Sequence, residues 1–363
     1  MVEIVKVSKP KEWRLFLDLP QQIYRRDPLW TPLPGKGQQL FQMQTNPILR
    51  HVRYECFLAL EKGVPVGRIA AITDDLLPDQ RVGLFGCFEA VNRSQVVQEL
   101  LRAAASDLKN KGKKQMQGPV TMNTSQQVGL LVEGFQIPPQ AYMPYNPPYY
   151  GELLEANGCS PLLDLYSYLW DGQIKRAATL KAVARRAARI PGIRWRTINL
   201  NDPWREGQRF AELHNKTMTN QWGFVPMNQE EAAAFLSGLR TYADPELLFY
   251  CEVNGEAVGV CLMMPDTGPQ LRATRRSDFF PLFQVPRSRN LRVGVLGVIP
   301  EYRRRGIVAL LIDRAVQLAY KKGYRRAELS LIMAGNKEMN SIITSAVGNS
   351  EKKVFRIYQK AVD

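Results

Sequence analysis

The sequence predicts an α/β protein made of two copies of one unit. Strand-like segments, glycine turns and one amphipathic helix follow each other in the same order in both halves of the 363-residue chain. The length suits two domains better than one core. A hydrophobic content of 45% and a charged content of 23% are typical of an ordinary globular protein.

The first half supplies one complete set of elements. They are predicted, in order, as strands at residues 54–60, 64–72 and 82–90, a helix at 94–111 and a strand at 114–120. The helix carries an apolar stripe at Val97, Leu100, Leu101, Ala104 and Leu108. A turn at Lys62-Gly63 separates the first two strands, and Gly112 ends the helix.

The second half repeats that order. Its predicted elements are strands at residues 247–253, 257–264 and 291–299, a helix at 306–322 and a strand at 326–332. Asn254-Gly255 is a hairpin turn, and Gly323 ends the helix. Each copy also opens with a strand (3–7; 193–199) and closes with a helix and a strand (148–157 then 163–170; 337–347 then 354–362).

The spacing of matching glycines locates an insertion. The turn glycines Gly63 and Gly255 are 192 residues apart, whereas the helix-ending Gly112 and Gly323 are 211 apart. The 19 extra residues fall at about 265–290, an arginine-rich segment that we expect to be a lid over the acceptor site or a membrane-surface or partner-binding loop. The predicted organisation is a first domain at 1–172, a basic connecting helix at 173–192 and a second domain at 193–363.

Charge is distributed unequally between the halves. Residues 1–172 contain 18 Lys and Arg against 17 Asp and Glu, and residues 173–363 contain 31 against 17, so the net charges are +1 and +14. A basic half indicates an anionic partner such as a phosphorylated cofactor, nucleic acid or an acidic membrane face. No apolar run reaches the length of a membrane span, the first residues do not form a signal-peptide core, and the five cysteines are scattered. We therefore expect a cytoplasmic protein with no metal site.

The second half contains a basic turn between a predicted strand and a predicted helix, and this turn is its candidate functional site. Arg303, Arg304, Arg305 and Gly306 form the turn. Unpaired N–H groups at a helix N-terminus attract anions, and a glycine lets the backbone approach phosphate oxygens closely. The turn therefore predicts a diphosphate-binding site.

This segment resembles motif A of the GNAT superfamily of N-acetyltransferases at Val298, Pro300, Tyr302, Arg303 and Gly306. Val308 departs from the Gly or Ala usual at the end of that motif. The resemblance implies two tandem GNAT-like units, each a mixed, mainly antiparallel, twisted sheet flanked by helices. It also implies transfer of an acyl group from acetyl-CoA or another acyl-CoA to a small-molecule or peptide amine. The cofactor-binding residues that it implies are Leu296, Gly297, Val298, Arg303, Arg304, Arg305, Gly306, Ile307, Val308, Asn336 and Asn340, the two asparagines being equally explained as helix caps.

The catalytic residues stay unknown. Many family members place a tyrosine seven or eight residues after the asparagine, and no tyrosine occurs there after Asn336 or Asn340. His214 could serve as a base, or it could be a core or surface histidine. Two stiff aromatic loops suggest an acceptor cleft between the domains, although their rings could equally hold the two copies together. The candidate substrate residues are Tyr145, Asn146, Tyr149, His214, Trp222 and Phe224.

The first copy lacks the basic turn, because its equivalent segment reads Val91-Asn92-Arg93-Ser94 after Glu89. We therefore expect only the second copy to bind coenzyme A. The whole chain also resembles a bacterial group of long GNAT proteins of unknown substrate, through the stretches at residues 129–135, 143–150 and 220–226. Two alternatives stay open: a Fem-like transferase that uses aminoacyl-tRNA, and a non-catalytic coenzyme A sensor or scaffold. The small diphosphate turn argues against a nucleic-acid partner.

Overall fold

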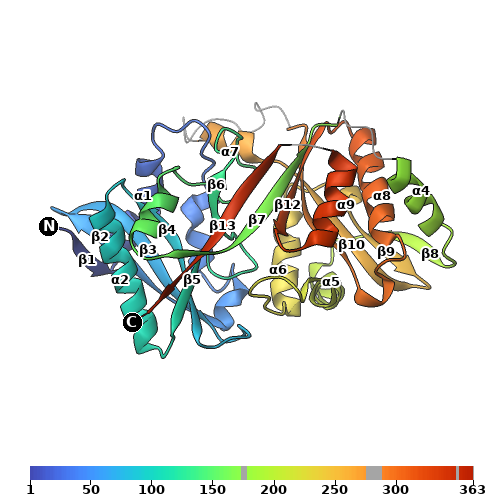
Figure 1. Cartoon of the computed structure of the whole chain (residues 1–363). Coiled ribbons are helices and arrows are strands. Elements are labelled where there is room, and N and C mark those ends of the chain that lie inside the picture. The colour runs from blue at the N-terminus through green and yellow to red at the C-terminus, as the bar shows by residue number, and fades with distance from the viewer. Residues whose placement is uncertain (173–177, 275–287, 349–350, 363) are drawn as a thin grey trace.

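A single mixed sheet crosses the molecule from one end to the other (Figure 1). The computed structural model describes residues 1–172, 178–274, 288–348 and 351–362. The strands follow the order β1-β2-β3-β4-β5-β13-β7-β12-β11-β10-β9-β8, and β6 pairs with β13 beside this path. Among the strand pairs of these described residues, β4–β5 and β11–β12 are parallel and the others are antiparallel.

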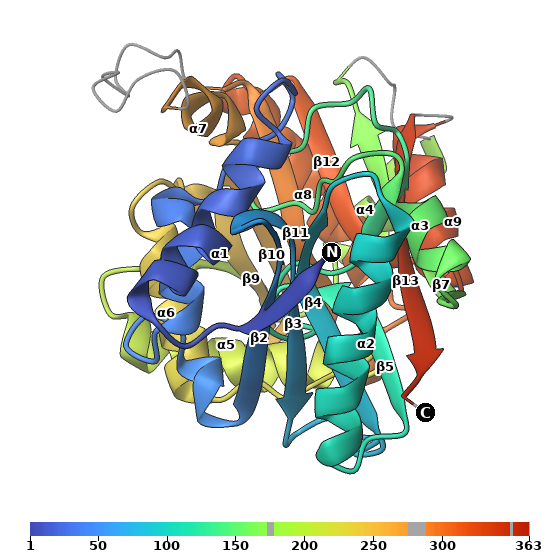
Figure 2. The same ribbon diagram turned by 90° about the vertical axis from the view of Figure 1, so that its left-hand side faces the viewer.

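The first unit has the predicted order of elements. It consists of β1 (Glu3–Lys6), α1 (Pro10–Ile23), the 3-10 helices η1 (Pro34–Phe41) and η2 (Pro47–Arg50), β2 (Val52–Glu61), β3 (Val64–Asp74), β4 (Val82–Ala90), α2 (Ser94–Asn110), β5 (Gln115–Val120), β6 (Leu130–Glu133) and α3 (Tyr150–Ala156). All five residues of the predicted helical stripe in α2 are buried against the sheet. In Figure 2, α2 covers one face of this unit and α1 lies on the opposite side.

The second unit repeats this arrangement. It consists of α4 (Ala178–Ala187), β8 (Ile193–Thr197), α5 (Pro203–Met218), α6 (Gln229–Leu239), η3 (Pro245–Leu247), β9 (Leu248–Val253), β10 (Glu256–Pro265), α7 (Gly268–Thr274), β11 (Asn290–Val298), η5 (Pro300–Tyr302), α8 (Ile307–Lys321), β12 (Arg326–Met333) and α9 (Lys337–Val347). One hydrophobic core joins α4, α8 and α9 to the sheet, and a second core joins α5 and α6 to it from the other side.

The two predicted hairpin turns have the same backbone geometry. Lys62 and Gly63 have φ of 49° and 78°, and Asn254 and Gly255 have φ of 53° and 87°. Two consecutive positive φ angles are typical of the type I′ turn, whose twist matches that of the flanking strands. The repeat read from the sequence is therefore present in the turns as well as in the strands.

The last strand of each half pairs with the other half of the chain. β7 (Ser160–Trp170) pairs with β12, and β13 (Lys352–Ala361) pairs with β5, β6 and β7. In Figure 1 these two strands lie side by side in the middle of the molecule, and the chain ends beside α2. Lys353 Nζ lies 2.9 Å from Glu328 Oε2, and Ser167 Oγ donates to Glu328 Oε1 at 2.7 Å. Both charged side chains are only 1% exposed, so a buried ion pair joins β13, β12 and β7.

Two further predicted segments are partly described. α4 is the described part of the predicted connecting helix, and it buries Leu180, Ala184 and Ala187 rather than standing free in solvent. The predicted lid segment begins with α7, where Arg272 Nη1 donates to Thr31 Oγ1 at 2.7 Å and to the Pro139 carbonyl at 3.1 Å. This start of the segment is therefore bound to the first unit, and residues 275–287 lie outside the described residues.

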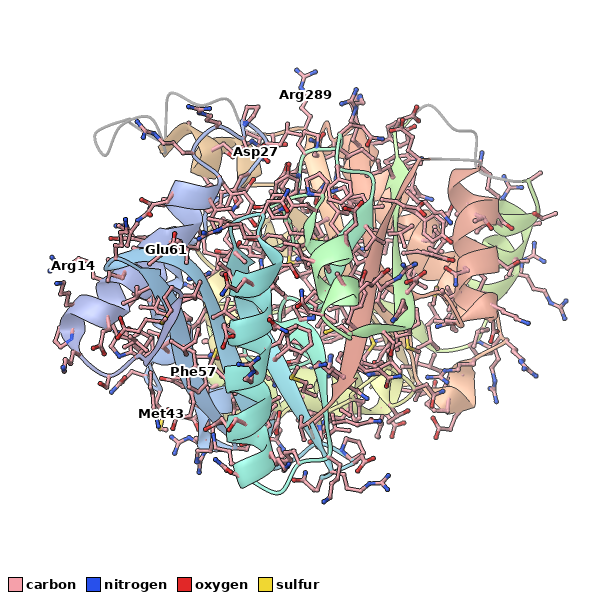
Figure 3. The ribbon with its side chains drawn as sticks, turned by 60° about the vertical axis from the view of Figure 1, so that its left-hand side comes forward. Arg14, Asp27, Met43, Phe57, Glu61 and Arg289 are labelled. Atoms are coloured by element: carbon pink, nitrogen blue, oxygen red, sulfur yellow. The ribbon has the colours of Figure 1, made fainter. Side chains whose placement is uncertain are left out.

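Surface arginines account for part of the positive charge. Arg14 and Arg289 are exposed and point away from the ribbon in Figure 3. Within the described ranges, none of the helices combines the length and the hydrophobicity that a membrane span needs.

Candidate active site

The basic turn between β11 and α8 has the geometry of an anion site. Gly306 is the N-cap of α8 in the left-handed conformation, with φ of 81° and ψ of 5°. No side chain caps the helix, so its first N–H groups have no side-chain partner at the cap. The helix N-terminus and its dipole therefore favour a diphosphate group at this turn.

The three arginines of the turn have different surroundings. The Arg303 guanidinium donates to the carbonyls of Val298 at 3.1 Å and Thr217 at 3.2 Å. These bonds hold the turn against β11 and α5. Arg304 and Arg305 are both exposed, but Arg305 stacks on the Tyr302 ring at 5.0 Å, whereas Arg304 lines a cavity beside the turn. Arg304 is thus the side chain of the three that is best placed to meet a ligand's negative charge.

β11 and β12 diverge and leave a cavity between them. They pair only from Asn290 to Val293 on the β11 side, and β11 continues to Val298 with β10 alone as its partner. The cavity has a volume of about 700 Å³ and reaches the turn. Its lining includes eight of the predicted cofactor residues, namely Leu296, Gly297, Val298, Arg303, Arg304, Gly306, Val308 and Asn336.

The other three predicted cofactor residues do not line that cavity. Ile307 is buried in the core, and Arg305 is turned toward Tyr302. The Asn340 amide donates to the carbonyls of Met333 at 2.9 Å, Ala334 at 3.3 Å and Asn336 at 2.9 Å, and its Oδ1 accepts from Tyr168 at 2.9 Å. Asn340 therefore holds the start of α9. Asn336 caps the same helix by accepting from Met339 N at 3.1 Å, and it still lines the cavity.

The first unit has no room for a cofactor at the equivalent place. β4 and β5 stay paired as far as Gly86 and Val120, where β5 ends. A Cβ added to Gly86 would lie 1.8 Å from the Val120 carbonyl oxygen, so the two strands are in direct backbone contact. A pantetheine arm that lies between two diverging strands cannot enter there.

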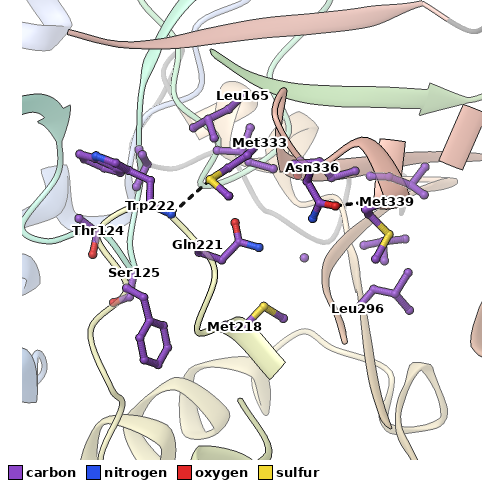
Figure 4. Close-up of a pocket in the computed structure, with 18 of the residues that line it drawn as sticks. Thr124, Ser125, Leu165, Met218, Gln221, Trp222, Leu296, Met333, Asn336 and Met339 are labelled. Atoms are coloured by element: carbon purple, nitrogen blue, oxygen red, sulfur yellow. Dashed lines mark hydrogen bonds between the residues drawn. The ribbon is translucent and has the colours of Figure 1, made fainter. Parts of the chain in front are cut away.

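A second cavity adjoins the first on the side of α5 (Figure 4). Its volume is about 260 Å³, and it shares Met218, Gln221, Leu296, Met333, Asn336 and Met339 with the first cavity. His214, Trp222 and Phe224 line it. Trp222 is fixed in place because its backbone N lies 3.3 Å from Met333 Sδ and its indole Nε1 donates to Gln117 Oε1 at 3.1 Å. Three predicted substrate residues thus meet beside the predicted cofactor cavity.

The environment of His214 suits a base. Its Nδ1 is buried and has no hydrogen-bond partner among the described residues. Burial lowers the pKa of His214, and a hydrogen bond with Asn215 opposes this effect. His214 lines the cavity, and a neutral imidazole can accept a proton.

The aromatic loop of the first unit does not join this group. The Tyr145 hydroxyl donates to Asp27 Oδ2 at 2.8 Å, and the Tyr149 hydroxyl donates to the Ala90 carbonyl at 2.9 Å. Asn146 Oδ1 accepts from the backbone N of Leu131 at 2.7 Å. These three candidates hold the first unit together, and two of them, Tyr145 and Asn146, also line a separate cavity of about 150 Å³ there.

Sequence reasoning missed Arg292, which lines the second cavity together with His214. Its Nε donates to Ser330 Oγ at 3.1 Å. Burial lowers its pKa, and the charge of Glu328 opposes that effect. A single arginine inside the apolar strand pattern Leu291-Arg292-Val293 is a signal that could have identified it, because a buried charge needs a reason.

Comparisons with known proteins give matches to the second unit and to the whole chain. The model of the acetyltransferase (GNAT) family matches residues 207–341. The chain is 29% identical to a protein of Caulobacter vibrioides named bacterial ceramide synthase, over 99% of this chain and 98% of that protein. It is 27% identical to protein YghO of Escherichia coli, over 96% of this chain and 93% of that protein.

A solved structure shows the same two-unit fold. A tandem GNAT protein from the clavulanic acid biosynthesis pathway superposes with a TM-score of 0.60 at 13% identity, over 100% of this chain and 99% of that one. The match to the family model identifies a GNAT acetyltransferase domain at residues 207–341, which supports an acyl-CoA-dependent N-acyltransferase, and the chain as a whole has the fold of two GNAT units in tandem.

Proposed function

We propose that this protein transfers a fatty acyl group from acyl-CoA to the primary amine of a long-chain amino alcohol, forming an amide. The observation that carries the proposal is the junction of two cavities, one at the Gly306 turn and one at His214, through shared walls at Leu296 and Asn336. The name of the Caulobacter relative supports the substrate class, since a ceramide is the amide of a fatty acid and a long-chain amino alcohol.

The residues of the first cavity fit an acyl-CoA. The α8 N-terminus and Arg304 would bind the diphosphate, and the free edge of β11 from Gly294 to Val298 would bind the pantetheine amides. When bound, acyl-CoA supplies a thioester carbonyl. A backbone N–H on that edge of β11 would stabilise the negative charge that develops on the carbonyl oxygen.

His214 and Arg292 would prepare the amine. An amine must be neutral to attack a carbonyl, and a nearby guanidinium raises the free energy of the charged ammonium form. Arg292 lines the same cavity as His214 and so disfavours ammonium there. The imidazole of His214 would accept the proton that the amine loses as the amide bond forms and the C–S bond breaks, with coenzyme A as the leaving group.

Thiol release from acyl-CoA tests the activity directly. Purified protein is given acetyl-CoA or palmitoyl-CoA together with an alkylamine, a long-chain amino alcohol or a lysine peptide, and the amide is identified by mass spectrometry. We expect thiol release with the amino alcohol and the corresponding amide as product. Tight binding of coenzyme A without thiol release for any amine would instead support the non-catalytic sensor.

Binding measurements locate the cofactor. By calorimetry, Arg304→Glu should weaken binding of coenzyme A about tenfold or more, equivalent to about 1.4 kcal/mol or more. Gly306→Glu should abolish binding, since the new side chain brings negative charge and, at a φ of 81°, backbone strain. Arg304→Glu replaces one non-glycine residue with another, so it changes the charge of the turn without the backbone strain that Gly306→Glu introduces. Unchanged affinity in both folded variants would place the cofactor elsewhere.

A further inference from the structure

We infer that the first unit forms one wall of the acceptor site and binds the alkyl chain of the amine. A third cavity, of about 430 Å³, lies between the units and shares Ser125, Gln126, His214, Arg292 and Gly294 with the second cavity. Leu33 and Leu40, at the start and near the end of η1, line it from the first unit, and Phe235 and Leu239 of α6 line it from the second. The inference rests on the proposed function, because it concerns the acceptor of that reaction.

The cavity has a charged part and a larger, mainly apolar part. The residues that it shares with the second cavity include Arg292 and His214. The rest of its wall includes the apolar side chains of Leu33, Leu40, Phe210, Phe235, Met227 and Met264, together with the polar side chains of Gln39, Thr121, Gln127, Tyr142 and Tyr242. An amphipathic amine fits this division, with its amine at His214 and its alkyl chain between η1 and α6.

The wall of the cavity that faces the first unit would limit the length of the alkyl chain that the cavity can hold. Leu33, Gly37 and Leu40 line this cavity and also the 150 Å³ cavity of the first unit. A Cβ added to Gly37 would lie 3.3 Å from Cδ1 of both leucines, so these three residues form a thin, closely packed partition. The first unit thus lacks space for a cofactor and instead supplies the surface that the end of the chain meets.

If the alkyl chain of the amine is buried in this cavity, the affinity for the amine should rise with each added carbon. Each CH₂ that enters an apolar cavity contributes about fourfold in affinity, which corresponds to about 0.8 kcal/mol. For wild type, the KM of n-alkylamines should fall by up to about fourfold per carbon until the chain reaches the partition. Longer amines should then bind no more tightly.

Gly238 allows the cavity to be filled without strain. It lies on α6, lines the cavity, and a Cβ added to it would meet nothing within 4 Å. A helical side chain at 238 leans toward the preceding turn, where Ala234 and Phe235 also line the cavity. Gly238→Phe therefore puts a ring where the alkyl chain would lie. Ser237→Phe is the matched control, because it adds the same ring at the neighbouring exposed position outside the cavity lining.

The experiment varies the acceptor and the donor separately. KM is measured for hexylamine to hexadecylamine with acetyl-CoA, and for acetyl-CoA to palmitoyl-CoA with hexylamine. We expect Gly238→Phe to raise KM for long amines tenfold or more, to leave hexylamine and every acyl-CoA within twofold, and Ser237→Phe to behave as wild type. A penalty that grows with the length of the acyl-CoA would assign the cavity to the donor chain and overturn the inference.

Binding without turnover separates this inference from the proposed function. Affinities of the same amines for wild type and Gly238→Phe are measured by calorimetry without acyl-CoA. A wild-type affinity that rises with chain length and is lost in Gly238→Phe supports the cavity, even if no thiol is ever released and the proposed function fails. If the affinity does not depend on chain length, the inference that this cavity binds the alkyl chain is wrong, whether or not the protein is active.

Discussion

The two histidines of the chain have pKa values that their surroundings move in opposite directions. Burial lowers the pKa of His214, with Asn215 opposing, so its ring is neutral at pH 7. Burial also disfavours charge on His51, but its bonds to Asp74 and Glu231 outweigh that effect and raise the pKa of His51 to about 9. His214 is therefore suited to accept a proton, and His51 carries a positive charge at neutral pH.

Replacement of His214 tests its role as a base. We expect His214→Ala to reduce kcat by about 10² to 10⁴ while the affinity for acyl-CoA stays unchanged, because only proton transfer is lost. Since burial lowers the pKa of His214, the rate that depends on its neutral form should persist to a lower pH than for an exposed histidine. Added imidazole should restore part of the rate of His214→Ala. A kcat equal to that of wild type would remove His214 from the mechanism.

The sequence predicted the positions of some candidate site residues and missed others. Gly306 and the motif around it could be predicted, because a strand, a basic turn and a helix are encoded by neighbouring residues. Asn336 and Asn340 could not be distinguished from each other, since their roles depend on which backbone carbonyls face each amide in the folded chain. Arg292 was missed because its partner Ser330 lies on another strand.

At the scale of elements, the difference between the two units lies in one pair of strands. In the second unit β11 and β12 separate after Val293, whereas in the first unit β4 and β5 stay in contact at Gly86 and Val120. Gly86 permits this contact because it has no side chain. Loss of the basic turn was visible in the sequence, but closure of the cleft was not.

Gly86→Ala should destabilise the first unit. Its Cβ would clash with the Val120 carbonyl, which is backbone and cannot move as a flexible side chain does. We expect a loss of about 1–3 kcal/mol or more in the free energy of unfolding, measured by urea denaturation. Gly238→Ala is the control, because its Cβ meets open space on a helix and should be neutral or stabilising by up to about 1 kcal/mol. Equal stability of the two variants would contradict the contact.

At the scale of the molecule, the exchange of β7 and β13 makes the two units depend on each other. Each half of the chain expressed alone would lack a central strand and expose unpaired edges. We expect fragments 1–177 and 178–363 to be aggregated or unfolded separately and to form a soluble complex when co-expressed. A fragment that unfolds cooperatively as a monomer would show that the exchanged strand is dispensable.

His51 links the units through charge. It lies after η2 in the first unit, and its protonated ring donates to Asp74 Oδ1 at 2.7 Å and to Glu231 Oε1 of α6 at 3.1 Å. Because its pKa is higher in the folded state than the unfolded value of about 6.5, its stabilisation is complete below pH 6.5 and is lost as the pH rises through about 9.

The unfolding free energy should follow that titration. Between pH 6.5 and 9.5 the wild type should lose on the order of 2 kcal/mol relative to His51→Gln, whose stability lacks this component. Thermal unfolding of both proteins across this range measures the difference. Parallel pH profiles for the two proteins would mean that His51 is not charged in the folded state.

Local patterns were sufficient for the order of elements, the duplication, the hairpin turns and the turn from strand to helix at Gly306, because each depends on residues close together in the chain. The exchange of last strands, the closed cleft of the first unit and the meeting of His214 with Arg292 and η1 depend on the tertiary structure. These features arise from pairing and packing between distant segments, for which a single sequence carries no periodic signal. The two aromatic loops illustrate this: both were predicted from the sequence, yet only the fold places Trp222 beside the cavity at the Gly306 turn and Tyr149 against β4.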